Sequence, residues 1–128
     1  MRGMKHRQKK IVLVVDDDAS LLRALRRLLL AMDLSVLTFD SAEAFLASEL
    51  PAGNVCLLVD IYLPGMSGTD LCKTLAASGR SLPTILMTAR DDAATQRIAR
   101  EAGALSTLYK PFDEDALLNT IARALGDN

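Results

Sequence analysis

The stretch Val55 to Gly68, VCLLVDIYLPGMSG, decides the fold. Its first five residues are apolar without a break, and Asp60 follows them ahead of a loop that contains Pro64 and Gly65. An unbroken apolar run that ends in turn residues is typical of a strand buried on both faces of a parallel sheet. Asp60 therefore stands where this strand meets solvent, and the residue alone is consistent either with a functional site or with a simple cap of the following turn.

Four further apolar segments have the same form, and the segments between them have the spacing of amphipathic helices. Strands are predicted at Ile11 to Val15, Leu34 to Phe39, Pro83 to Met87 and Ala104 to Tyr109. Helices are predicted after Asp18, from Asp40 to about Leu50, from Gly68 to Ser78, from Asp91 or Asp92 to Glu101, and from Asp113 to about Leu125. In the second helix, Asp40 and Glu43 have the spacing of a capping box.

Strand and helix thus alternate five times, which predicts a single α/β domain with a doubly wound five-stranded parallel sheet. The flavodoxin-like order for such a sheet is 2-1-3-4-5, with the ligand site at the switch point between strands one and three. Under this order the two strands at the switch point are the ones that end in Asp16-Asp17 and in Asp60.

Composition separates a short tail from this domain. Residues 1–10 contain five Lys and Arg and no acid, and the apolar run behind them is too short for a signal peptide. We expect a basic, disordered tail at 1–10 and a domain at 11–126. The tail is either a solvated end or a weak contact for nucleic acid or an acidic partner.

The charge and cysteine content of the domain exclude several functions. Without the tail, 10 basic and 16 acidic residues remain, so direct nucleic-acid binding by the domain is not expected. No apolar run is long enough to span a membrane. Cys56 and Cys72 lack metal-ligand spacing and fit a reducing cytoplasm, and the single histidine, His6, lies in the tail.

Three carboxylates, those of Asp16, Asp17 and Asp60, are expected at one edge of the sheet. Carboxylates brought together either hold a proton or recruit a cation, and oxygen ligands with open positions suit Mg²⁺. Asp16 and Asp17 can instead be read as charges that favour a helix start. One aspartate is enough for that cap, and Asp18 supplies it, so two carboxylates are left over.

Two more strand ends reach the same edge, with Thr88 after the fourth strand and Lys110 after the fifth. A hydroxyl and an ammonium beside a metal–carboxylate cluster suit a phosphoryl group, whose charge spreads over three oxygens. Asp60 can then act as the nucleophile and form an acyl phosphate. Taken singly, Thr88 is an ordinary strand-end hydroxyl and Lys110 an ordinary solvated charge.

With these residues in place, the chain resembles the receiver domain of two-component response regulators from Ile11 to Leu125. The resemblance is carried by four segments in a fixed order, VVDDD at 14–18, VDIYLPGMSG at 59–68, LMTAR at 86–90 and YKPF at 109–112. Two others, SAEAFLASEL at 41–50 and LPTILMTA at 82–89, look most similar to receivers of the nitrogen-fixation or nitrate-response type.

The resemblance implies a role for each site residue. Asp60 would take the phosphoryl group, and Mg²⁺ would be bound by Asp17, Asp60 and the carbonyl of Tyr62, with Asp16 acting through water. Lys110 and the amide of Ala89 would contact the phosphoryl group. The peptide bond between Lys110 and Pro111 would be cis. Thr88 would move toward the group and switch the face formed by the fourth helix, fifth strand and fifth helix.

The implied partners are those of a signalling switch. The phosphoryl donor would be a sensor histidine kinase, a phosphotransfer protein or a small phosphodonor, with kinase specificity around Leu22, Arg23 and Arg26. Phosphorylation would control an output domain, a downstream protein or a homodimer. The chain would be no enzyme beyond its own phosphoryl uptake and slow autodephosphorylation. The alternative is a phosphorylation-independent interaction module on the same fold.

Enzymes on similar folds fit less well. Aspartate phosphatases commonly carry a second acid two residues after the nucleophile, where this chain has Tyr62. Flavin binders place a hydroxyl- and glycine-rich loop after the first strand, where three aspartates would repel phosphate. No G-x-G-x-x-G follows Val15, which excludes a dinucleotide fingerprint.

The chain departs from the usual receiver pattern at one position and carries bulky residues at two others. Receivers usually have an aromatic residue three before the lysine, and this chain has Thr107. Tyr109 lies on the same side of the strand, so we expect it either to take part in the switch or to act only in packing. Tyr62 and Arg90 flank the path of attacking water, which predicts slow autodephosphorylation.

Overall fold

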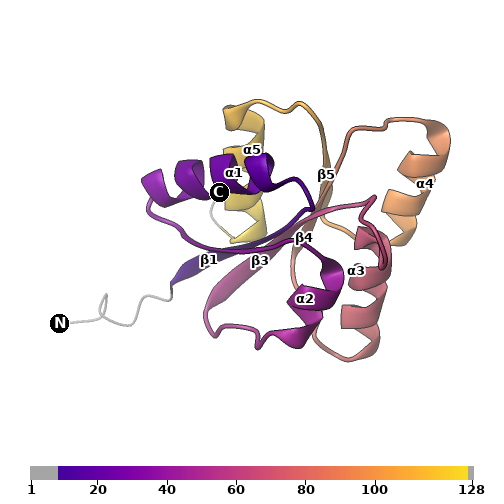
Figure 1. The fold of residues 1–128 in the computed structure, drawn as a ribbon, viewed down its shortest axis with the longest axis horizontal. Coiled ribbons are helices and arrows are strands. Elements are labelled where there is room, and N and C mark those ends of the chain that lie inside the picture. The colour runs from indigo at the N-terminus through magenta and orange to yellow at the C-terminus, as the bar shows by residue number, and fades with distance from the viewer. Residues whose placement is uncertain (1–8, 127–128) are drawn as a thin grey trace.

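The computed structural model describes residues 9–126, in which five strands alternate with five helices (Figure 1). The strands are β1 (Lys10–Val15), β2 (Ser35–Phe39), β3 (Asn54–Asp60), β4 (Thr84–Thr88) and β5 (Ser106–Tyr109). The helices are α1 (Ala19–Ala31), α2 (Ala42–Ala47), α3 (Gly68–Ala77), α4 (Ala93–Glu101) and α5 (Glu114–Ala124).

The strands form one parallel sheet in the order β2-β1-β3-β4-β5, which confirms the predicted fold and the predicted switch point. β1 and β3 are in register, with Val15 opposite Val59. Because Val15 and Val59 are level with each other, the residues that follow these two, Asp16 and Asp60, arrive at the same edge of the sheet.

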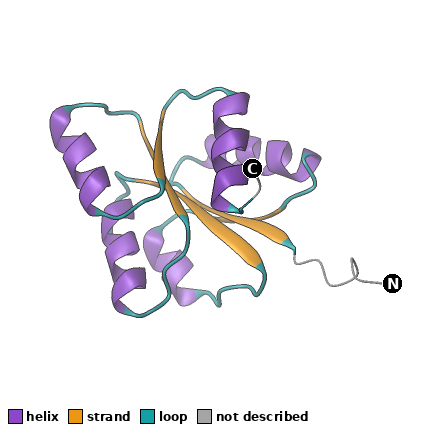
Figure 2. Ribbon diagram, turned by 180° about the vertical axis from the view of Figure 1, so that it is seen from behind, coloured by secondary structure: helices purple, strands orange, loops and turns teal. Residues whose placement is uncertain are grey.

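Helices cover both faces of the sheet (Figures 1 and 2). The core on one face includes Leu25 of α1 and Leu117 of α5, and the core on the other includes Phe45 of α2 and Leu71 of α3. Successive residues of β1, β3 and β4 enter opposite cores, and this is why each reads as an unbroken apolar run. Each fully buried large side chain contributes about 1.5–3 kcal/mol.

The predicted capping box of α2 was wrong. Ser41, not Asp40, is the N-cap, and its hydroxyl accepts from the amide of Ala44 at 3.0 Å. Glu43 does not reach back to the cap, because its carboxylate accepts a hydrogen bond from the amide of Met66, 23 residues away. The helix also ends earlier than predicted, at Ala47.

Other boundaries moved by one or two residues. β4 begins after Pro83, and β5 begins at Ser106 rather than at Ala104. β1 begins at Lys10, inside the predicted tail, because Lys10 pairs with Asn54 of β3. The rest of the predicted tail, residues 1–8, lies outside the described residues. Within 9–126, no helix combines the length and apolarity that a membrane crossing requires.

Candidate functional site

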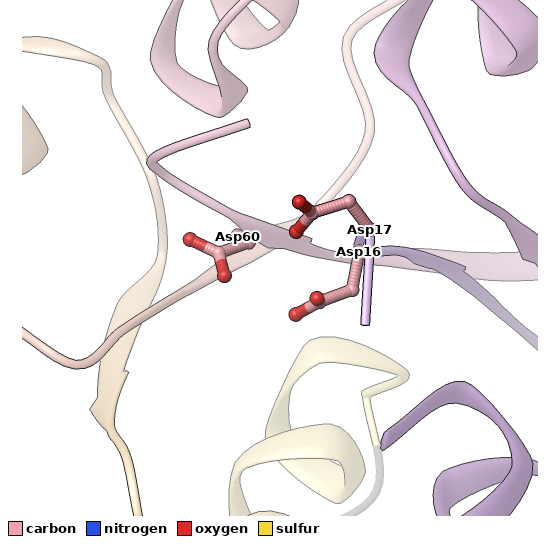
Figure 3. A group of neighbouring side chains, drawn as sticks. All are labelled: Asp16, Asp17 and Asp60. Atoms are coloured by element: carbon pink, nitrogen blue, oxygen red, sulfur yellow. The ribbon is translucent and has the colours of Figure 1, made fainter. Parts of the chain in front are cut away.

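The site is built on three aspartates at the carboxyl end of the sheet (Figure 3). Asp16 and Asp17 follow β1, and Asp60 is the last residue of β3. One oxygen from each carboxylate lies within 4.8 Å of the other two. Asp16 is fully buried and Asp60 is 8% exposed, whereas Asp17 is open to solvent. The predicted convergence of the three carboxylates is therefore present.

Lys110 brings the positive charge to this cluster. Its ammonium donates to Asp16 Oδ2 at 2.8 Å and to Asp60 Oδ2 at 2.6 Å. Burial acts to lower the pKa of Lys110, but hydrogen bonds and charges of the two aspartates outweigh it and raise this pKa. Burial raises the pKa of the Asp60 carboxyl, opposed by the bond from Lys110. Lys110 therefore stays protonated at neutral pH and bridges the ends of β1 and β3.

Local backbone bonds hold the aspartates in place. Asp16 Oδ1 accepts from the amide of Asp18 at 2.9 Å, and Asp18 in turn caps α1, as predicted. Asp60 Oδ1 accepts from the amide of Tyr62, also at 2.9 Å. Gly68 packs so closely on the Asp60 carbonyl oxygen that any Cβ at this position would overlap it. The start of α3 can therefore approach the end of β3 only with glycine at this position.

A second support reaches the β3–α3 loop from α2. The Glu43 carboxylate accepts from the amide of Met66 at 2.9 Å and occupies the space that a Cβ at Gly65 would need, and Gly65 has a φ of +74°. The hydrogen bond from this amide lowers the pKa of Glu43. This contact was not predicted from the sequence, because the spacing of Glu43 from Asp40 matched a capping box that does not form.

The charge of the cluster fits a divalent cation. The three carboxylates carry three negative charges and Lys110 balances one, so two remain. The three carboxylates offer only oxygen atoms as ligands, and oxygen is the donor that Mg²⁺ prefers. Asp17 is exposed and makes no ion pair with Lys110, which pairs with Asp16 and Asp60. Asp16, Asp17 and Asp60 together can hold such an ion. The carbonyl of Tyr62 stays a predicted further ligand.

The other predicted site residues lie around this cluster. Thr88 ends β4 and is fully buried, and its hydroxyl accepts from the amide of Arg90 at 3.1 Å. Ala89 and Lys110 line a cavity of about 380 Å³ beside the site. The Lys110–Pro111 peptide bond is cis, as the resemblance implied.

Thr107 and Tyr109 lie on the same side of β5, as predicted, since Leu108 between them is buried in the core beneath α1 and α5. Both residues line a cavity of about 320 Å³ next to α4. Tyr109 is 40% exposed, and its hydroxyl has no hydrogen-bond partner among residues 9–126. The switch role suggested for Tyr109 stays a prediction.

Tyr62, Arg90, Asp92 and Thr95 form a cluster of contacts beside the site. The Arg90 guanidinium lies 4.6 Å from the centre of the Tyr62 ring and donates to Asp92 at 3.1 and 3.3 Å. The Tyr62 hydroxyl lies 2.6 Å from the hydroxyl oxygen of Thr95 on α4. The contact between Tyr62 and Arg90 was not predicted, and Thr95 had no signal beyond its helical position.

The fold and site define a flavodoxin-like α/β domain with an acidic, lysine-bridged site at the switch point of its sheet. Comparison with known families makes this more specific. The family model described as "response regulator receiver domain" matches residues 12–122. The chain therefore belongs to the receiver domains of two-component response regulators.

Relatives support the predicted subtype. Over 116 residues the chain is 38% identical to nodulation protein W of Bradyrhizobium diazoefficiens, covering 91% of this chain and 51% of that protein. Over 113 residues it is 36% identical to the transcriptional regulatory protein FixJ of Azorhizobium caulinodans, covering 88% and 54%. The chain thus spans about half the length of these relatives.

Solved structures agree with the fold. The crystal structure of FixJ-N matches with a TM-score of 0.85 at 32% identity and covers 93% of this chain and 95% of that one. The response regulator StyR matches with a TM-score of 0.84 at 42% identity, covering 92% and 60%. The predicted resemblance to receivers of the nitrogen-fixation type is confirmed at this level.

Proposed function

We propose that Asp60 accepts a phosphoryl group from the phosphohistidine of a sensor kinase or from a small phosphodonor, and that this controls a protein contact. The observation that carries the proposal is the position of the Asp60 carboxylate, which is held between Lys110 and the acids that follow β1. A carboxylate fixed in this way is oriented for attack and is adjacent to the charge that must stabilise the transferred group.

Transfer needs one bond to form and one to break. An oxygen of Asp60 bonds to phosphorus as the phosphorus–nitrogen bond to the kinase histidine breaks, and the electron pair leaves with the imidazole. Lys110, already 2.6 Å from Asp60, contacts the phosphoryl oxygens and neutralises part of their charge. Asp17, Asp60 and the Tyr62 carbonyl would hold Mg²⁺, with Asp16 acting through water, and the bound ion would supply the remaining neutralisation.

Phosphorylation changes the part of the site formed by Thr88 and Ala89. Thr88 turns toward the phosphoryl group, which the Ala89 amide also contacts, and the change reaches the face of α4, β5 and α5. This face then binds a downstream protein, an output domain or a second copy of the chain. The kinase recognises α1 around Leu22, Arg23 and Arg26.

The acyl phosphate is long-lived in this proposal. The side chains at Tyr62, two residues after Asp60, and at Arg90, two residues after Thr88, flank the route that water would take to phosphorus in this proposal. The chain performs only its own phosphoryl uptake and this slow loss. Tyr62→Asn removes the ring and should release phosphate several-fold faster, as followed by intact mass after the donor is removed. An unchanged half-life would contradict the shielding.

The test is incubation with acetyl phosphate or phosphoramidate, with and without Mg²⁺, followed by intact mass. We expect a metal-dependent gain of one alkali-labile phosphoryl group in the wild type and none in Asp60→Ala. Asp70→Ala, which removes an exposed carboxylate on α3, is the matched control and should behave as the wild type. No gain in the wild type would favour a module whose contacts do not depend on phosphate.

A further inference from the structure

A pair of hydroxyl groups links the loop after Asp60 to the first turn of α4. The Tyr62 hydroxyl lies 2.6 Å from Thr95 Oγ1, and Thr95 is fully buried. The amide of Thr95 also donates to the N-cap residue Asp92 at 2.8 Å. The start of α4 is therefore attached both to its own cap and to the loop that follows the candidate phosphorylation site.

Arg90 connects this pair to Thr88. Its amide donates to Thr88 Oγ1 at 3.1 Å, while its guanidinium bonds to Asp92 and lies over the Tyr62 ring. Asp92 uses one oxygen for Arg90 and the other to cap α4. A continuous chain of contacts thus runs from the Thr88 hydroxyl through Arg90 to the N-cap of α4 and to Tyr62.

We propose that the Tyr62–Thr95 pair and Arg90 form a latch that holds the start of α4 in the unmodified protein and opens when Asp60 is phosphorylated. This inference rests on the proposed function, because phosphorylation supplies the trigger. A Thr88 hydroxyl that turns to a phosphoryl oxygen gives up its bond from the Arg90 amide. Arg90 then loses its anchor on β4, and its contacts with Asp92 and Tyr62 are no longer held in position.

The latch puts the aromatic part of the switch in the loop after β3. Position 107 on β5 holds a threonine, which has no ring to swing inward. Tyr109 has a ring, but within the described part of the chain its hydroxyl contacts no partner. The Tyr62 ring contacts Arg90, whose amide is bonded to Thr88, and the Tyr62 hydroxyl contacts Thr95 of α4. Tyr62 therefore connects the strand end at Thr88 with the start of α4.

The experiment measures amide hydrogen exchange at Thr95 and Gln96 by NMR in the full chain. Tyr62→Phe and Thr95→Val each remove one hydroxyl and keep the shape of the side chain. Without any phosphodonor, we expect each variant to exchange about fivefold faster at these amides, the factor for one ordinary hydrogen bond. The double variant should exchange no faster than the single ones, because both substitutions break the same contact. Tyr109→Phe is the matched control and should leave the exchange unchanged.

The second arm adds beryllium fluoride and Mg²⁺, with phosphoryl uptake from acetyl phosphate checked separately by mass. The wild type should then exchange faster at Thr95 and Gln96, and Tyr62→Phe should show little further increase. If the single variants exchange as the wild type does, or if the wild type takes up phosphate with no change at α4, the latch is wrong. If no phosphate is taken up, the proposed function and the opening step fail, while the first arm still decides whether the hydroxyl pair holds α4.

Discussion

Replacement of Lys110 by methionine tests the electrostatic account of the site. The methionine side chain would keep most of the apolar stem, but the substitution would remove both hydrogen bonds, at 2.8 Å to Asp16 and 2.6 Å to Asp60. Asp16 would then be a fully buried carboxylate with no cation beside it. The charge of the cluster would also rise from two to three negative charges.

The expected loss follows from the burial of the pair. Removing one partner of a fully buried ion pair costs about 3–5 kcal/mol. The Lys110 side chain is 22% exposed, so water already screens part of the interaction, and we expect a loss of about 2–3 kcal/mol. With an m-value of roughly 1.5–2 kcal/mol per molar urea, the unfolding midpoint should fall by about 1–2 M.

Urea unfolding followed by circular dichroism at neutral pH without Mg²⁺ measures this loss. Lys73→Met, which changes an exposed lysine on α3, is the matched control and should shift stability by less than about 0.5 kcal/mol. Addition of Mg²⁺ should stabilise Lys110→Met more than the wild type, because the carboxylate cluster of the variant carries one more uncompensated negative charge. Equal losses for the two lysine variants would refute the reasoning.

Other contacts in the structure lead to three further predictions. Glu43→Ala should raise exchange of the loop amide that it binds by about fivefold, whereas Glu43→Gln keeps an acceptor and most of the protection. Burial raises the pKa of Cys56 to about 12 and also raises that of Cys72, so a disulfide reagent at pH 8 should label both only after unfolding; rapid native labelling would contradict this. The hydrogen bonds that Asp92 accepts at the start of α4 lower its pKa in the folded protein from the ordinary value of 3.8. The ionised carboxylate therefore stabilises the fold above pH 3.8, and this stabilisation is lost as the pH falls through the lowered pKa of the folded state. Asp92→Ala should therefore lower the melting temperature at pH 7 and lower it less at pH 3, and equal shifts would count against the cap.

Most of the fold was predictable because its determinants are local and periodic. The five apolar runs predicted the strands. Helix starts were predicted at Asp18, at Asp91 or Asp92, and at Asp113, and the structure has Asp18, Asp92 and Asp113 as the N-caps. The order of the strands followed from the rules for short parallel connections. The capping-box prediction was wrong because both Asp40 and Ser41 can act as an N-cap, and the helix begins directly after Ser41.

The site was predictable only in part, for a related reason. Residues at strand ends are placed by the sheet, so the approach of Asp16, Asp60 and Lys110 could be derived from topology. Contacts made by long side chains across loops have no period in the sequence. The bond of Glu43 to the amide of Met66 and that of Tyr62 to Thr95 depend on where the loop between β3 and α3 lies relative to α2 and α4, which no spacing rule provides.

The loop between β3 and α3 has contacts with more elements than a simple connection needs. Its start is bonded to Asp60, and Glu43 of α2 holds its middle. Gly68 joins its end to α3, and Tyr62 reaches α4. The strands themselves are buried and close-packed, so they are stiff and deform little. In the proposed switch, a change of charge at Asp60 would therefore reach α2, α3 and α4 through the contacts of this loop.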